Sequence, residues 1–367
     1  MKKKAKVFVA GHRGLVGSAI LRQLESEGYH NLVVRTRREV DLANQQEAGA
    51  FVEVEKPEYV FSAAARVGGI WANSAYPAEF IYENLQIQIN VIHSAYVHGV
   101  SKLLVLGSSC IYPRQCPQPM KEEYLLTQPL EPTNEAYAIA KIAGIKMCQF
   151  YHQQYGANFV SVMPTNLFGP GDNFDLTTSH VLPAFIRKFH LAKLASQGDW
   201  EEIQKDESRF GKIPKDIMAG LVAIAQSQGL SIPRSLKTQA PGMTPTPAIT
   251  LWGTGRPRRE FLYVDDLADA CLFVMDHVDA NWLHGKGISH LNIGTGSDIS
   301  ISELANMVKE IVGYEGAIAY DTSKPDGMLQ KMLDVNRLTS LGWKHRTPLR
   351  EGIEKSYTWY LAQTKAE

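Results

Sequence analysis

The sequence has 367 residues, 44% of them hydrophobic, and its 38 basic side chains balance 38 acidic ones. This length allows one large or two ordinary domains, and the balanced charge argues against a nucleic-acid-binding surface that depends on overall charge. No run approaches the ~18 consecutive apolar residues that a membrane span needs. The four cysteines form no CxxC pair, so we expect a globular, cytoplasmic protein with reduced thiols, no membrane partner and no metal site.

The first motif lies in residues 7–20, with the sequence VFVAGHRGLVGSAI. Residues 7–9 are apolar, as in a strand buried on both faces, and Gly11, Gly14 and Gly17 follow at three-residue spacing. One glycine would allow a sharp turn, one the close approach of a pyrophosphate, and one the packing of a helix on the sheet. The alternative is a loop followed by a glycine-tolerant helix. We predict an α/β fold with a Rossmann-type doubly wound parallel sheet, and the GxxGxxG spacing is typical of short-chain dehydrogenases.

A basic cluster follows the second predicted strand, residues 32–34. It contains Arg35, Arg37 and Arg38, and Arg13 lies within the glycine turn. An acidic residue after this strand would favour NAD, whereas guanidinium groups suit the 2′-phosphate of NADPH. The cluster therefore predicts NADPH, unless the arginines form only a solvated basic face.

The next predicted elements include a strand whose carboxyl end is followed by candidate active-site residues. Residues 59–65 predict a buried strand, and Pro77 begins a helix with two apolar flanks, one for the sheet and one for a second subunit. A strand at residues 102–106 runs directly into Gly107, Ser108, Ser109 and Cys110. Ligands of parallel sheets bind beyond the carboxyl ends of the strands, so these residues are expected to line an active site.

The segment at residues 131–146 predicts a helix that carries Tyr137 and Lys141 on one face. A nearby ammonium group favours phenolate and would lower the pKa of Tyr137, which could then exchange protons near neutral pH. With Ser108 to hydrogen-bond a substrate oxygen, these residues predict a reductase centre. Tyr320 and Lys324 repeat the YxxxK spacing, but Lys324 lies in the loop-like run DTSKPDG. This second pair is therefore not expected to be catalytic.

The remaining pattern divides the chain into two parts. We predict an NADP-binding domain at residues 1–180, to which residues 249–300 return in part, and a smaller substrate-binding lobe at residues 181–248 and 301–367. Residues 193–248 contain a charged helical piece, an apolar one around residues 217–225 and a Pro-rich stretch, PGMTPTPA. Asp265 is expected to cap one helix, and Ser300 with Glu303 forms a capping-box pattern for another.

Several runs taken in order resemble the GDP-L-fucose synthase family of extended short-chain dehydrogenase/reductases. They are GHRGLVGSAI, AAARVGGIWAN, LGSSCIYP, EPTNEAYAIAKIAGIK, MPTNLFGP, RREFLYVDD, NIGTG and SKPDG. The resemblance covers nearly the whole chain apart from residues 193–248. It implies a homodimeric, NADPH-dependent 3,5-epimerase and 4-reductase that converts GDP-4-keto-6-deoxy-D-mannose into GDP-L-fucose.

The resemblance also implies roles for particular residues. The implied catalytic residues are Ser108, Tyr137 and Lys141 for reduction, and Cys110 and His180 as the acid/base pair of epimerisation. The implied cofactor-binding residues are Gly11, His12, Arg13, Gly14, Leu15, Val16, Gly17, Arg37, Arg38, Asp41, Leu42, Leu106, Gly107, Ser109, Pro164, Thr165, Asn166 and Leu167. The implied substrate-binding residues are Lys188, Trp252, Arg259, Lys324 and Asp326. Lys188 stands where an arginine is common, so its phosphate contact would be a point charge rather than a fork.

Three questions stay open from the sequence. Spacing alone favours ordinary structural roles for Cys110 and His180, and it does not assign which of them acts as base. Residues 193–248 are longer than the family usually has there, and they form either a flap over the sugar nucleotide or a peripheral insertion. The competing functions are another nucleotide-sugar 4-reductase or 4-epimerase, or a non-catalytic NADPH sensor.

Overall fold

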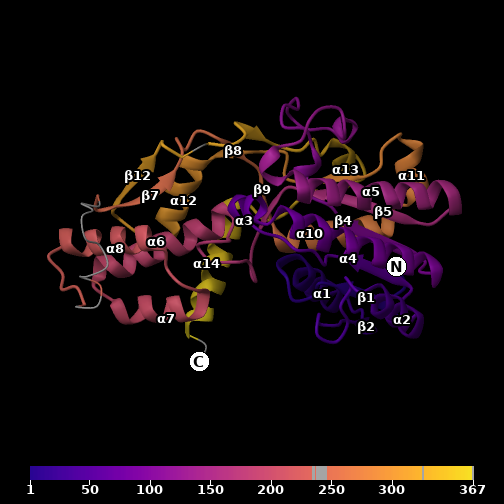
Figure 1. The fold of residues 1–367 in the computed structure, drawn as a ribbon, viewed down its shortest axis with the longest axis horizontal. Helices are drawn as coiled ribbons and strands as arrows, with labels where there is room; N and C mark the ends of the chain where they lie inside the picture. Colours follow the sequence, from indigo (N-terminus) through magenta and orange to yellow (C-terminus); the bar gives the residue numbers. More distant parts are fainter. Residues whose placement is uncertain (234–235, 237–245, 325, 366–367) are drawn as a thin grey trace. The chain divides into compact units, whose positions relative to one another are not determined.

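The computed structural model describes residues 1–233, 236, 246–324 and 326–365. The chain divides into two compact units (Figure 1). Unit 1 comprises Met1–Gly171, Glu260–Ser297 and Lys331–Thr347, and unit 2 comprises Asp172–Arg259, Asp298–Gln330 and Pro348–Glu367. Among the described residues, no helix is both long and apolar enough to cross a bilayer.

Unit 1 is built on a six-stranded sheet in which each neighbouring pair is parallel. In spatial order the strands are β2 (Leu32–Val33), β1 (Val7–Ala10), β3 (Tyr59–Ser62), β4 (Lys102–Leu106), β5 (Phe159–Pro164) and β10 (Leu291–Ile293). The direction of strand succession reverses between β1 and β3, and ligands of such sheets bind at this reversal. The predicted doubly wound sheet is confirmed.

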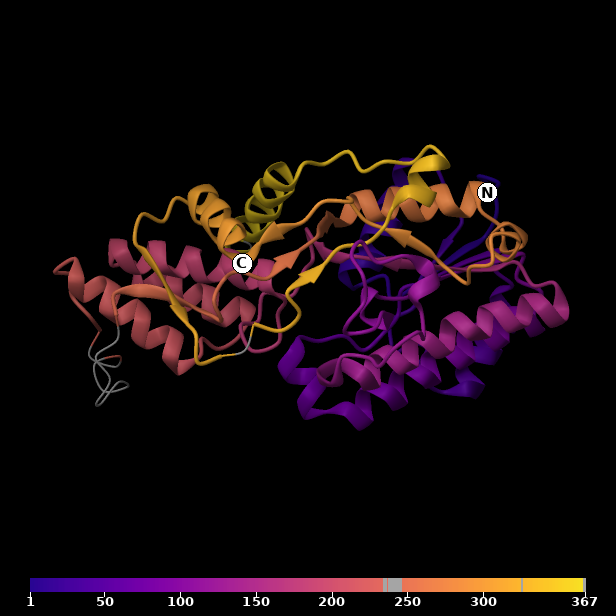
Figure 2. The ribbon, with the colours of Figure 1, turned by 90° about the horizontal axis from the view of Figure 1, so that it is seen from above.

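Helices cover both faces of this sheet. One hydrophobic core includes residues of α1 (Leu15–Ser26) and α10 (Val264–His277), and a second includes residues of α2 (Gln45–Glu55), α4 (Pro77–Val97) and α5 (Glu135–Tyr155). Figure 2 shows α4 and α5, in purple and magenta, running side by side, and these two helices are in extensive contact. Because both faces are covered, β1 and β4 are buried along their whole length, as their apolar sequences predict.

Shorter elements complete unit 1. They are α3 (Ile70–Ala75), η1 (Ser109–Ile111), η2 (Glu122–Tyr124), η3 (Pro132–Asn134), β6 (Asn166–Phe168), β9 (Phe261–Tyr263), α11 (Ala280–Gly285) and α13 (Asn336–Ser340). The predicted cap at Asp265 is wrong, because α10 begins at Val264 with Tyr263 in the cap position. Asp265 lies in the first turn instead, where it forms an ion pair with Arg22 at 2.6 Å.

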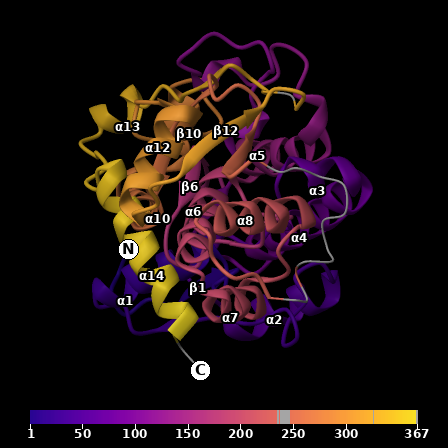
Figure 3. The same ribbon diagram turned by 90° about the vertical axis from the view of Figure 1, so that its left-hand side faces the viewer.

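Unit 2 is mainly helical (Figure 3). Its helices are α6 (Val181–Gln197), α7 (Trp200–Phe210), α8 (Lys215–Ser227), α12 (Ile301–Val312) and α14 (Leu349–Lys365). A parallel pair joins β7 (Ala248–Trp252) to β12 (Ala317–Asp321). A small sheet contains β11 (Ile299–Ser300), β8 (Arg258–Arg259) and β13 (Gln330–Lys331), of which Lys331 belongs to unit 1. The predicted capping box of Ser300 and Glu303 is confirmed at the start of α12.

The charged and apolar helical pieces predicted within residues 193–248 are α7 and α8, and both pack on α6. Arg187 of α6 is fully buried, with its Nε 2.8 Å from Asp206 Oδ1 of α7. Its Nη atoms donate to the carbonyls of Phe174, Phe210 and Gly211. Residues 234–235 and 237–245, which include part of PGMTPTPA, lie outside the described residues. The described helices of this segment are therefore a packed layer of unit 2.

Candidate active site

The glycine turn of unit 1 has the tight packing that a dinucleotide site needs. Gly11 has φ +82°, and a Cβ there would lie 2.8 Å from the backbone nitrogen of Ala64 on the β3 side. A Cβ on Gly17 would overlap the carbonyl of Gly11. Gly14, the N-cap of α1, is less crowded, since the nearest atom that a Cβ there would meet is the Gly11 carbonyl oxygen at 3.5 Å. Its lack of a side chain therefore leaves room for an approaching phosphate.

An unsatisfied polar atom adds to this fit. The side-chain Nδ1 of His12 is buried and has no hydrogen-bond partner among the described residues. Burial lowers the pKa of His12, and the neighbouring Arg13 charge acts in the same direction. A buried donor or acceptor without a partner costs stability unless a ligand or water satisfies it. The turn therefore fits the phosphates of a dinucleotide.

The structure separates the predicted arginine cluster into two kinds. Arg35 is half-buried, pairs with Glu55 at 2.6 Å and lies over the ring of Phe51. In contrast, the side chains of Arg13, Arg37 and Arg38 are exposed. Exposed guanidinium groups suit a 2′-phosphate. Arg37 forms ion pairs with Asp41 at 3.5 Å and Glu83 at 3.4 Å through an exposed side chain, whereas the Arg35–Glu55 pair is partly buried.

The two other predicted residues in this region have distinct positions. Asp41 forms an ion pair with Arg37 at 3.5 Å. Leu42 packs at the edge of the core that includes α2 and α4, and its carbonyl accepts a hydrogen bond from Asn90. Asp41 therefore pairs with one of the exposed arginines, and Leu42 belongs to the packing between α2 and α4.

The carboxyl end of β4 brings the predicted reductase residues together. Lys141 Nζ donates to the Leu106 carbonyl at 2.9 Å and lies 5.7 Å from the ring centroid of Tyr137. The Ser108 hydroxyl is hydrogen-bonded to the Tyr137 phenol. A Cβ at Gly107 would overlap the end of the Met163 side chain, which packs against the chain where it leaves the strand. These groups lie at the sheet edge that also carries the glycine turn.

The pKa of Tyr137 differs from the sequence expectation. Burial raises it above its usual value, the charge of Cys110 acts in the same direction, and the hydrogen bond from Ser108 opposes both. Burial also lowers the pKa of Lys141 to about 8. The expected lowering of the phenol pKa by the lysine is therefore wrong for this structure, because burial raises that pKa and the Lys141 ammonium group is directed at the Leu106 carbonyl.

The predicted cofactor residues after β5 are held by a buried glutamate that the sequence analysis missed. Thr165 Oγ1 and Asn166 Nδ2 both donate to the backbone carbonyl of Glu260, at 3.3 and 2.7 Å. The Glu260 side chain is itself fully buried and accepts hydrogen bonds from the backbone of Thr295 and Leu333. A glutamate beside the arginines of RREF resembles a surface ion pair in sequence, so no local signal reveals this role. Pro164 and Leu167 lie in the same stretch, on β5 and β6.

Cys110 lies on η1, whose N-cap is Ser108, and the neighbouring Ser109 is buried. Its Sγ receives contacts from Asn134 Nδ2 at 3.3 Å and from Lys331 Nζ at 3.7 Å. The sequence analysis named neither contact, since Lys331 is 221 residues away from Cys110.

Unit 2 contains the predicted residues of the nucleotide-sugar side. Trp252, at the end of β7, is 62% exposed, and Lys324 Nζ lies 5.4 Å from its ring centroid. Asp326 accepts hydrogen bonds from the backbone and hydroxyl of Thr254 at 2.6 and 2.7 Å. Burial lowers the pKa of Arg259, and the charge of Asp326 opposes that shift. An exposed indole beside cations can stack on a base and attract phosphates.

The two other predicted residues of unit 2 lie on α6. His180 is exposed at the N-cap position, and Lys188 is half-buried two turns further along the helix. Burial lowers the pKa of Lys188, and the charge of Asp216 on α8 opposes this shift. Lys188 is therefore a desolvated cation, which binds anions more strongly than a solvated one does.

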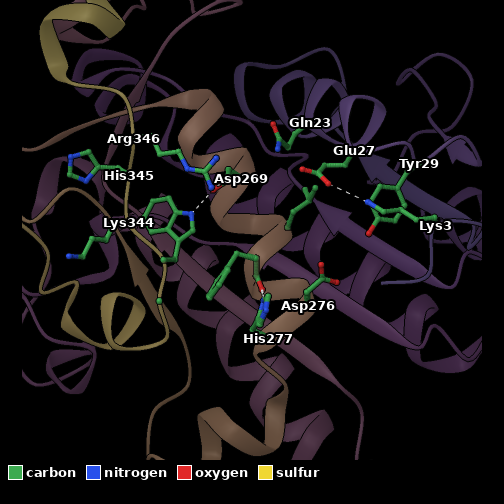
Figure 4. A pocket seen from close by; sticks show the side chains of 14 residues that line it. Lys3, Gln23, Glu27, Tyr29, Asp269, Asp276, His277, Lys344, His345 and Arg346 are labelled. Carbon is green, nitrogen blue, oxygen red and sulfur yellow. Dashed lines mark hydrogen bonds and ion pairs between the residues drawn. The ribbon is translucent and has the colours of Figure 1, made fainter.

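A cavity of about 520 Å³ in unit 1 contains none of these residues. It is lined by side chains of α1 and α10 and by residues 342–346 (Figure 4). Its charged groups are largely paired: Lys3 contacts Glu27, and Trp343 Nε1 donates to Asp269 at 2.7 Å. The predicted catalytic and binding residues therefore lie outside this cavity.

Comparisons with known proteins agree with this geometry. The sequence model of the NAD dependent epimerase/dehydratase family matches residues 7–205 and 226–294, and so leaves residues 206–225 of the α7–α8 segment unmatched. The protein named GDP-L-fucose synthase 1 of Arabidopsis thaliana is 50% identical over 359 residues, covering 98% of this chain and 94% of that protein. GDP-L-fucose synthase of Escherichia coli (strain K12) is 46% identical over 360 residues, covering 98% and 97%.

Solved structures give the same picture. A GDP-D-glycero-L-gluco-heptose synthase from Campylobacter jejuni, solved in the presence of NADPH, has a TM-score of 0.84 and 41% sequence identity. The match covers 98% of this chain and 99% of that one.

Proposed function

This chain belongs to the NAD dependent epimerase/dehydratase family and, within it, to the GDP-L-fucose synthases, and from this premise we propose the reaction and the residues that carry it out. The reaction is the NADPH-dependent 3,5-epimerisation and 4-reduction of GDP-4-keto-6-deoxy-D-mannose to GDP-L-fucose. The observation that carries the proposal is the cluster of Ser108, Tyr137 and Lys141 at the end of β4, on the same sheet edge as the glycine turn.

The cofactor assignment rests on how unit 1 is built. The turn at Gly11 and Gly14 would hold the pyrophosphate, and the exposed guanidinium groups of Arg13, Arg37 and Arg38 would hold the 2′-phosphate. When bound, NADPH supplies the hydride that reduces carbon 4.

Epimerisation uses the acidity of the carbons beside the ketone. Carbons 3 and 5 both flank the carbon 4 carbonyl, so their protons are acidified when Ser108 and Tyr137 donate hydrogen bonds to that oxygen. Cys110 and His180 then exchange protons with these carbons, since a thiol and an imidazole both titrate near neutral pH in their ordinary forms.

Reduction uses the same oxygen contact. Tyr137 transfers its proton to the oxygen as carbon 4 is reduced, and its raised pKa keeps the phenol protonated until then. Lys141 holds the nicotinamide ribose and orients the phenol. In unit 2, Trp252, Lys188, Arg259, Lys324 and Asp326 bind the GDP-sugar.

Two further features belong to the proposal. A homodimer is supported by apolar side chains exposed on α4 and α5, among them Tyr82 at 63% and Phe150 at 57% exposure. A reducing cytoplasmic location is supported by the four cysteines, all of which are free.

The test mixes the purified protein with NADPH and GDP-4-keto-6-deoxy-D-mannose in D2O, follows NADPH consumption and identifies the sugar by NMR. GDP-L-fucose with deuterium at carbons 3 and 5 is the expected product. GDP-D-rhamnose, or its carbon 4 epimer, would identify a plain 4-reductase and remove the roles of Cys110 and His180. No NADPH consumption with this or other keto-sugars would favour an NADPH sensor.

A further inference from the structure

The thiol of Cys110 faces two nitrogen donors that come from distant parts of unit 1. Asn134, from η3, directs its amide nitrogen at the sulfur from 3.3 Å, and Lys331, from β13, directs its ammonium group at it from 3.7 Å. The amide NH2 and the ammonium group are both hydrogen-bond donors, and neither can accept a proton from the thiol. Both therefore favour a negatively charged sulfur. A thiolate next to a lysine is more populated at neutral pH than a free thiolate is.

The backbone at and directly after Lys331 is held by hydrogen bonds to other segments of the chain. The Lys331 carbonyl accepts a hydrogen bond from the Glu260 backbone at 3.3 Å. The next residue, Met332, donates to the side chain of Gln118 at 2.9 Å, and Leu333 donates to the Glu260 carboxylate at 2.8 Å. Three hydrogen bonds over three consecutive residues therefore fix the backbone from which the lysine side chain extends.

Two titratable groups face Cys110 from the elements packed against it in the described part of unit 1, Lys331 on β13 and Tyr137 on α5. Burial raises the pKa of Tyr137, so the phenol is neutral at pH 7. Of these two groups, only Lys331 carries a charge that acts on the sulfur at this pH.

We propose that Lys331 is a positioning residue for epimerisation that holds Cys110 in its thiolate form. This rests on the proposed function. As the C–H bond at carbon 3 or 5 breaks, its proton passes to Sγ and forms an S–H bond, and its electron pair moves to the ketone oxygen as an enolate. Lys331 keeps its proton throughout and attracts the sulfur only while it is charged.

The first experiment measures the reactivity of the Cys110 thiol in the absence of the sugar substrate. The full-length protein with NADP+ and no sugar is alkylated with iodoacetamide between pH 5 and 10, and modification of each cysteine is followed by mass spectrometry. Burial raises the pKa of Cys116 to about 11 and of Cys148 to about 12, so Cys110 is expected to react first at neutral pH. In Lys331→Met, alkylation of Cys110 at pH 7 is expected to slow about tenfold, because the positive charge that favours the thiolate is gone.

Matched variants separate charge from structure. Lys331→Arg keeps the charge and is expected to keep most of the thiolate, whereas Asn134→Asp places a carboxylate beside the sulfur and is expected to slow alkylation. Lys121→Met removes an exposed lysine of the same unit and is expected to change nothing. If Lys331→Met does not fold, Lys331→Arg and Asn134→Asp still decide the matter: nearly unchanged alkylation is expected in the first and slowed alkylation in the second, and the reverse pattern would overturn the proposal.

The second experiment uses the sugar. Lys331→Met is expected to slow deuterium uptake at carbons 3 and 5 by about tenfold with a nearly unchanged KM. Alkylation at the wild-type rate, with only KM raised, would overturn the proposal and place Lys331 on the substrate phosphates. If the wild-type protein exchanges no protons, the proposed function fails, whereas the alkylation profile still decides the role of Lys331.

Discussion

Lys141 and Lys102 of unit 1 have different proposed roles, but both are buried and both have a lowered pKa. Lys141 and Lys102 are 4% and 6% exposed, and burial lowers the pKa of each to about 8. Lys102 donates to the carbonyls of Val274 and Met275 at the end of α10, far in sequence from the predicted reductase residues. It is therefore a natural control for Lys141.

Both lysines are expected to make stability rise with pH. Between pH 8 and 10.5 the unfolded chain keeps a proton that the folded protein has lost, so the free energy of unfolding increases over this range. Lys141→Met and Lys102→Met should each stabilise the protein below pH 8, by up to ~3 kcal/mol, and the gain should vanish near pH 10.5. Urea unfolding at about pH 7 and about pH 10 measures this effect.

The activity readout then separates the two residues. Only Lys141→Met is expected to lose NADPH consumption, because only Lys141 lies beside Tyr137. A stability difference that stays constant with pH would contradict the pKa assignment, and equal loss of activity in both variants would contradict the proposed role of Lys141.

Among the helical elements, α6 and α7 depend on one buried ion pair. Arg187 and Asp206 both have fully buried side chains, and the Tyr360 hydroxyl of α14 also hydrogen-bonds to Asp206. Removing one partner leaves a buried charge without compensation, which costs about 3–5 kcal/mol. Arg187→Met is therefore expected to lower the free energy of unfolding by that amount, as measured by urea denaturation.

The double variant Arg187→Met, Asp206→Leu provides the control. It removes both charges and is expected to recover much of the lost stability, because no unpaired charge remains. A loss below ~1 kcal/mol for Arg187→Met alone would mean that α7 is not held to α6 by this pair.

At the scale of the whole molecule, we expect the oligomeric state to depend on exposed apolar side chains of α4 and α5. Tyr82 and Ile89 are seven residues apart on α4, and Ile139 and Phe150 are eleven apart on α5, so each pair shares a helix face. All four side chains are more than 40% exposed. Adjacent exposed apolar residues on paired helices favour association with a second copy.

Size-exclusion chromatography with light scattering tests the dimer. The wild-type mass is expected to be twice the 40.8 kDa of one chain, and the double variant Ile89→Asp, Phe150→Asp is expected to have the mass of a single chain. Val54→Asp, on α2, alters a side chain that is 79% exposed elsewhere and should leave the mass unchanged. A monomeric wild-type protein would contradict the prediction.

Local sequence determined much of the architecture and the main candidate residues. The turn of Gly11 and Gly17, the strand that ends at Gly107 and the helix that carries Tyr137 were all predictable, because each depends on residues a few positions apart. The family resemblance added Cys110 and the nucleotide-sugar residues, which spacing alone left open.

Tertiary structure decided the contacts, the burial and the pKa shifts of these groups. It pairs Arg35 with Glu55, places Lys331 beside a cysteine 221 residues away, and buries Glu260 as an anchor for Asn166. It also reverses the expected pKa shift of Tyr137. Ion pairing and desolvation depend on every atom within several ångströms, and those atoms come from segments that only the folded chain brings together.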